Sequence, residues 1–166
     1  MHGLWKGLAW ALIAIAAPSA SAQQAAFKDQ LSGSWTLTST YLLEEDGKKD
    51  DPWGQNVQGT AIFGTGNRFT FMIVGADREK SGSSNPRAPV GPLVGHFGTY
   101  SVDEANKTIT LQVERSTFPG FDGASLKLAI ANLSADELTT VQTPPIPSRL
   151  APGKTTQPYN FYKRAR

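Results

Sequence analysis

Residues 108–116 read TITLQVERS, and this stretch decides the fold. Its apolar positions are Ile109, Leu111 and Val113, and its polar positions are Thr108, Thr110, Gln112 and Glu114. Side chains two residues apart lie on the same face of a strand, and β-branched residues favour strands. The stretch therefore predicts a strand with one face in a core and the other in solvent, as in an antiparallel sheet.

Seven other stretches carry a similar pattern, so the chain is expected to form eight strands with no helices between them. The additional strands are expected over 34–43, 58–63, 68–74, 94–102, 126–133, 138–143 and 157–164. Only residues 25–30 favour a helix. Many closely spaced strands without intervening helices indicate either a β-sandwich or an antiparallel barrel.

The lengths of the connections favour the barrel. Short turns are expected at 64–67, 103–107 and 134–137, and they alternate with longer connections at 44–57, 75–93, 117–125 and 144–156. In an up-and-down meander, each connection lies at the opposite end of the barrel from the one before it. The predicted fold is therefore all-β, an eight-stranded antiparallel up-and-down β-barrel with a short N-terminal helix, tight turns at one end and longer loops at the other. Such a barrel holds either side chains alone or one small ligand.

The first 22 residues are expected to be a secretory signal peptide. Lys6 precedes the apolar run 8–17, and Ala20-Ser21-Ala22 has the small residues that signal peptidase accepts. The run is shorter than the about 20 residues of a spanning helix. We therefore expect cleavage near Ala22, one domain over residues 23–166, and a periplasmic or secreted protein with no stable membrane insertion.

The composition excludes several classes of function. The 166 residues include no cysteine, which excludes disulfides, thiolate metal sites and a cysteine nucleophile. The formal charge is only +2, and the chain has no long basic runs, so the sequence lacks the clustered positive charge that is typical of nucleic-acid-binding proteins. We expect a monomer or a weak homodimer.

Several motifs, in order along the chain, resemble those of a known family. They read LSGSWTL at 31–37, PWG at 52–54, GNRF at 66–69 and FGTYSVD at 97–103. The first resembles the G-x-W motif of lipocalins, and the ordered series is similar to bacterial lipocalin-like domain proteins. The resemblance implies that Gly33 and Trp35 close the floor of the barrel, with a basic residue, Arg164 or Lys163, packed across the Trp35 ring. The meander independently places Trp35 and Arg164 at the same end.

Few residues carry a pattern typical of catalysis or metal binding. His96 is the only histidine after residue 22. It is a locally hydrogen-bonded strand residue, a polar contact for a ligand in the lumen, a general base or proton donor, or a haem axial ligand. A single histidine without cysteines does not make a zinc site unless carboxylates supply the rest. The acidic residues at 44–46 and 50–51 are expected to be solvated loop residues. We predict no catalytic residue, no metal and no cofactor.

The leading hypothesis is that the barrel binds a small, mainly apolar molecule in its lumen. Strand parity predicts these lining residues: Tyr41, Phe69, Phe71, His96, Tyr100, Leu111, Val113 and Arg115. Trp53, Phe118 and Phe121 are expected near the open end, where they either grip the ligand or pack over the core. Two alternatives are an isomerase or cyclase with His96 or Tyr100 as proton donor, and a packed barrel whose loops bind an envelope partner.

Overall fold

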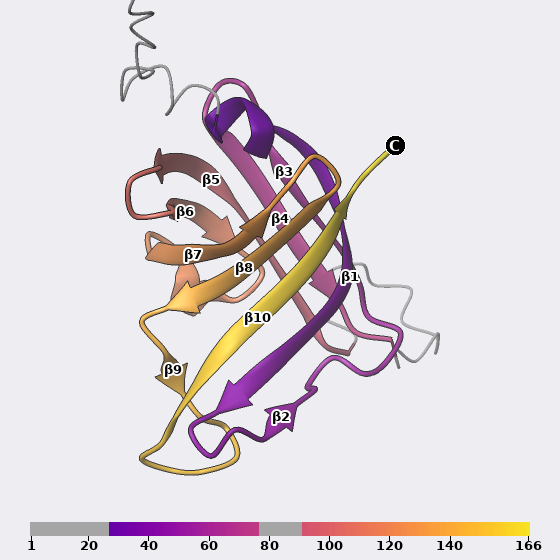
Figure 1. Cartoon of the computed structure of the whole chain (residues 1–166). Coiled ribbons are helices and arrows are strands. Elements are labelled where there is room, and N and C mark those ends of the chain that lie inside the picture. The colour runs from indigo at the N-terminus through magenta and orange to yellow at the C-terminus, as the bar shows by residue number, and fades with distance from the viewer. Residues whose placement is uncertain (1–26, 77–90) are drawn as a thin grey trace, which may run out of the picture.

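A computed structural model describes residues 27–76 and 91–166, and its strands form one closed antiparallel barrel (Figure 1). The eight barrel strands are β1 (Gly33–Glu44), β3 (Gln58–Phe63), β4 (Arg68–Val74), β5 (Leu93–Asp103), β6 (Thr108–Ser116), β7 (Ser125–Leu133), β8 (Glu137–Thr143) and β10 (Thr155–Arg164). Two short strands, β2 (Lys49–Asp50) and β9 (Ile146–Pro147), extend the edges of β1 and β10. The prediction of an eight-stranded antiparallel barrel is confirmed.

The strand order is that of an up-and-down meander. Each barrel strand pairs with its neighbour in sequence, and β1 pairs with β10 from Trp35–Arg164 to Glu44–Thr156 to close the ring. The tight turns and a short helix over residues 27–31 lie at one end, whereas β2 and β9 lie at the other (Figure 1). We call these the closed end and the open end. The expected connection at 75–93 and the expected signal peptide fall largely or wholly outside the described residues.

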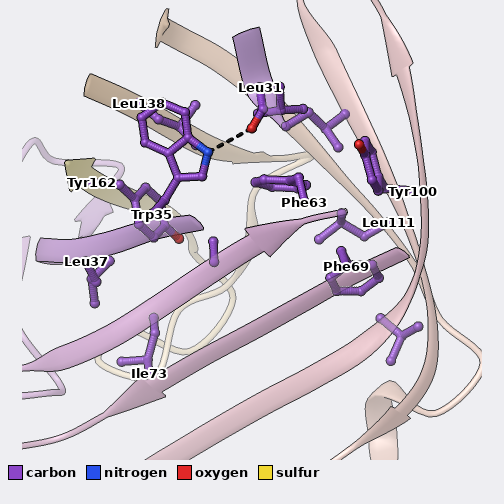
Figure 2. Close-up of a cluster of buried hydrophobic side chains, with 13 residues drawn as sticks. Leu31, Trp35, Leu37, Phe63, Phe69, Ile73, Tyr100, Leu111, Leu138 and Tyr162 are labelled. Carbon is purple, nitrogen blue, oxygen red and sulfur yellow. Dashed lines mark hydrogen bonds between the residues drawn. The ribbon is translucent and has the colours of Figure 1, made fainter. Parts of the chain in front are cut away.

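A continuous apolar core fills the closed half of the barrel (Figure 2). Its thirteen buried residues are Leu31, Trp35, Leu37, Ala61, Phe63, Phe69, Ile73, Tyr100, Ile109, Leu111, Val113, Leu138 and Tyr162. The ring of Phe63 meets that of Tyr100 edge to face at 5.2 Å. The Tyr100 hydroxyl donates to the Gly64 carbonyl in the β3–β4 turn, at 3.1 Å. This half of the lumen is therefore packed with side chains.

Trp35 and Arg164 form the floor. The Trp35 ring is fully buried, and its Nε1 donates to the Leu31 carbonyl at 2.8 Å (Figure 2). The Arg164 guanidinium carbon lies 4.1 Å from the centre of the Trp35 ring. Its nitrogens also donate to the carbonyls of Gln30, Ser32 and Ala135. Arg164 thus joins the helix, the β7–β8 turn and the Trp35 ring.

The backbone conformation and the space at the floor explain why position 33, the glycine of the G-x-W motif, is a glycine. Gly33 has a φ of 121°, a backbone conformation that L residues with a side chain rarely adopt. A Cβ there would also lie 3.0 Å from Nη1 of Arg164. Gly33 therefore lets the chain turn from the helix into β1 directly beneath the guanidinium.

Register shifts change the side-chain parity on two strands that border the open half. One lies between Leu37 and Ser39 in the β1–β10 ladder, and another between Phe97 and Gly98 in the β5–β6 ladder. An extra residue on one strand moves every later side chain to the opposite face. At the second shift, a Cβ on Gly98 would lie 1.9 Å from the Gln112 carbonyl oxygen, so glycine permits this close approach.

Candidate functional site

A cavity of about 400 Å³ occupies the open end of the barrel, above the packed core. Its size lies within the range of small-molecule sites. Most of its wall is apolar, and this part comprises Leu42, Pro52, Trp53, Phe71, Ile73, Leu93, Val94, Phe118, Phe121, Leu126, Ile146 and Pro158. The polar lining residues are Thr40, His96, Gln142, Arg149 and Asn160. The cavity therefore combines a broad apolar surface with a few polar groups.

His96 is held in the cavity wall by aromatic rings. It is 6% exposed, and its imidazole stacks on Phe71 at 5.4 Å with an interplanar angle of 8°. Phe121 of the short helix η1 (Pro119–Phe121) meets the imidazole edge to face at 5.1 Å. Nδ1 lies 2.9 Å from Oγ of Ser116, which faces His96 from β6. Burial lowers the pKa of His96, so the imidazole is neutral at neutral pH.

The opposite wall carries a hydrogen-bonded amide. Oγ1 of Thr40 lies 2.8 Å from Oδ1 of Asn160 and 2.9 Å from the Tyr159 carbonyl oxygen. Asn160 is 8% exposed and lines the cavity. The contact with Thr40 occupies its amide oxygen, whereas its amide nitrogen has no partner within 27–76 and 91–166. Asn160 thus offers neutral N–H donors to the cavity.

Arg149 lines the cavity with its charge already paired. Its Nε lies 2.7 Å from Oδ2 of Asp50, and its Nη2 lies 2.8 Å from Oδ1. This two-point geometry matches the planar fork of a guanidinium to a carboxylate. The side chain of Asp50 is 12% exposed and that of Arg149 is 52% exposed. Asp50 lies on β2 opposite Leu42, so the pair ties the 148–154 loop to β2 beside β1.

Two of the eight predicted lining residues, Phe71 and His96, border the cavity. Four others, Phe69, Tyr100, Leu111 and Val113, face inward as expected but belong to the packed core of the closed half. The Tyr100 hydroxyl is bonded to Gly64 in a closed-end turn, so it does not face the cavity. The predicted floor residues Gly33, Trp35 and Arg164 lie together at the closed end.

The expectation that Tyr41 and Arg115 face the lumen is wrong, and the register shifts explain both errors. After the shift in β1, Thr40 and Leu42 face the cavity, whereas Tyr41 stacks on Tyr159 at 5.1 Å under Lys49. After the shift in β6, Arg115 is exposed and lies 3.7 Å from Asp122.

The three loop aromatics expected near this end, Trp53, Phe118 and Phe121, all line the cavity. The sequence analysis missed Thr40, Leu42, Gln142, Arg149 and Asn160. Asn160 lies on the same parity of β10 as the buried Tyr162, which is a signal that could have found it. The position of Arg149 depends on its ion pair with Asp50, 99 residues away in sequence, and no local sequence pattern predicts that pair.

None of the groupings of His, Asp and Glu in residues 27–76 and 91–166 has the arrangement needed to hold a metal ion. In the same ranges, no helix has both the length and the apolar character needed to cross a membrane.

The geometry defines a class: an up-and-down barrel with a tryptophan-sealed floor and a cavity at its other end. A model of the lipocalin-like domain family matches residues 32–157, and the chain belongs to this family. No curated protein matches the chain.

Solved structures with a similar arrangement share little sequence with the chain. Bovine odorant binding protein, as a deswapped triple mutant, is 15% identical, with 82% of this chain and 74% of that chain covered at a TM-score of 0.42. A redesigned β-barrel is 13% identical, with 84% and 95% covered at a TM-score of 0.41. The protein EF1p2_mFAP2b bound to DFHBI is 14% identical, with 86% and 98% covered at a TM-score of 0.43.

Proposed function

We propose that the protein binds a small, mainly apolar molecule, without covalent chemistry, in the cavity at the open end. The observation that carries the proposal is the cavity of about 400 Å³ and its predominantly apolar wall. Fully burying one large apolar side chain contributes about 1.5–3 kcal/mol relative to exposure. A few such surfaces covered together support micromolar binding, about −8 kcal/mol.

The two alternatives have unequal support. A completely packed barrel, acting only through its loops, does not account for a hollow open half. An isomerase or cyclase retains His96 as a polar group at the cavity, whereas the Tyr100 hydroxyl is engaged with Gly64. Binding therefore has the broader support, because it needs only the cavity itself.

Dye binding tests the proposal. Prodan, a neutral naphthalene ketone, and anilinonaphthalene sulfonate, an anionic dye, would be titrated into the protein while fluorescence is recorded. We expect saturable one-to-one binding of at least one dye. Absence of saturable binding by either dye would contradict a carrier function.

A pair of variants locates the binding site. Val94 lines the cavity, and Met72 lies on the outer face of the adjacent strand and is 40% exposed. Val94→Trp should fill the cavity and weaken dye binding at least about tenfold, close to 1.4 kcal/mol. Met72→Trp adds a similar bulk outside and should leave binding unchanged. Equal loss in two variants that are as stable as the wild type would exclude this cavity.

We also propose that the protein acts after export, in the periplasm or outside the cell. The support is the sequence pattern alone: Lys6, the apolar run at 8–17 and Ala20-Ser21-Ala22. N-terminal analysis of the secreted protein should find Gln23, or its cyclised form, as the first residue. A mature soluble species that still carries Met1 would contradict export by this route.

A further inference from the structure

Apart from Arg149, the polar side chains that line the cavity are uncharged. His96 is neutral at neutral pH, and its Nε2 has no hydrogen-bond partner among the residues that the structure describes. Depending on which nitrogen carries the proton, Nε2 offers one donor or one acceptor. The amide nitrogen of Asn160 adds neutral donors on the opposite wall. The cavity therefore offers neutral hydrogen-bond donors to a ligand oxygen, but it offers no unpaired positive charge.

The only basic side chain in the described part of the cavity wall is Arg149. Asp50 holds its guanidinium at two points, with N–O distances of 2.7 and 2.8 Å. A carboxylate ligand would have to compete with Asp50, whose side chain is the more buried partner. Asp50 thus removes the positive charge that a lipid-like acid would need.

A second carboxyl group, that of Glu44, lies at the open-end terminus of β1, the strand that pairs with β2. Glu44 follows Leu42 by two residues on β1 and is 7% exposed. Its Oε1 is buried, with no hydrogen-bond partner in the described residues. Glu44 supplies no positive charge to the cavity, because it is acidic and lines a separate pocket beside the β1–β2 turn. Burying a charge without a partner costs far more than burying a hydrogen-bonded neutral group.

We propose that the cavity selects uncharged ligands with a single hydrogen-bonding oxygen function, such as an ester, ketone or alcohol, and that Asp50 enforces this selectivity by neutralising Arg149. This inference rests on the proposed binding function and names its ligand class. A cavity of about 400 Å³ accommodates about thirteen non-hydrogen atoms, taking the liquid volume per water-sized group as about 30 Å³.

Isomeric probes test the selectivity. Methyl nonanoate and decanoic acid contain the same atoms, but at neutral pH only the acid is charged. Decylammonium is a cation of similar length. Calorimetric titration should give a Kd for methyl nonanoate at least about tenfold lower than for decanoate or decylammonium. Equal or tighter binding of either ion would overturn the selectivity while leaving the binding function intact. Failure of all three probes and of both dyes would overturn the binding function itself.

Variants assign the selectivity to Asp50. Asp50→Asn keeps the side-chain shape but leaves the Arg149 charge uncompensated, so decanoate should bind about tenfold more tightly and methyl nonanoate within about twofold of wild type. Adding Arg149→Gln to Asp50→Asn should remove the gain. Asp136→Asn makes the same change in net charge at an exposed closed-end position and should have no effect. No gain in Asp50→Asn, or an equal gain in Asp136→Asn, would contradict the role of Asp50.

Discussion

The two ends of this barrel are made from the same strands but differ in packing: the closed end is filled with side chains, whereas the open end contains a cavity. At the closed end, Trp35 is fully buried and Arg164 reaches three carbonyl groups and the Trp35 ring. At the open end, Trp53 and Phe121 are only half-buried and border a cavity. Dense packing and satisfied polar groups give stability, whereas unfilled apolar surface is available to a ligand. Mutations at the closed end should therefore reduce folding stability, and mutations at the open end should mainly reduce binding.

The largest effect is expected for Trp35→Ala. The change removes a large ring from a fully packed site and also leaves the Leu31 carbonyl without its donor. Large-to-small changes of this kind cost about 3–5 kcal/mol in the free energy of unfolding. Urea unfolding measures this cost. An unchanged midpoint and slope would show that the ring does not support the floor.

Arg164→Met should have the next largest effect, about 1–3 kcal/mol. Methionine keeps much of the apolar stem but removes the donors to Gln30, Ser32 and Ala135 and the cation over Trp35. Lys163→Met is the matched control, since the neighbouring Lys163 is exposed. Equal losses in the two variants would show that the cost comes from removing a positive charge at the end of β10, and not from the contacts of Arg164.

A smaller effect on stability is expected for Trp53→Ala, about 1 kcal/mol, because the ring is only half-buried. The same variant should weaken dye binding, since Trp53 lines the cavity. Urea unfolding and dye titration on one sample separate the two effects. The contrast between the ends would fail if Trp53→Ala destabilised the protein as much as Trp35→Ala.

Sequence reasoning was more successful at the closed end than at the open end, for a physical reason. The floor depends on local signals, namely a glycine–tryptophan pair at a strand start and a basic residue at the last strand's end. Strand alternation also placed Leu111 and Val113 inside correctly.

The open end depends on features that alternation does not encode. An extra residue in β1 turns Tyr41 outward and Thr40 and Leu42 inward, and a second extra residue, in β6, turns Arg115 outward. How far the core fills the lumen also depends on side chains from all eight strands. For this reason Phe69 and Leu111 are part of the packed core rather than the cavity wall.

The smallest expected effect is a pH dependence at the open end. Burial lowers the pKa of His96 below its ordinary value of 6.5, so the unfolded chain binds this proton more readily than the folded protein does. The contribution of the neutral imidazole to stability is therefore complete above about pH 6.5. It is lost as the pH falls from there through the lower folded pKa. His96→Phe keeps an aromatic ring between Phe71 and Phe121 and cannot titrate.

The stability difference between wild type and His96→Phe should therefore shift in favour of the variant as the pH falls below about 6.5, which urea unfolding at several pH values measures. The protein without residues 1–22 has one histidine, so NMR of the imidazole protons reports this pKa without ambiguity. A measured value above 6.5 would reverse the sign and would place His96 in water or beside an acidic group rather than in an apolar wall.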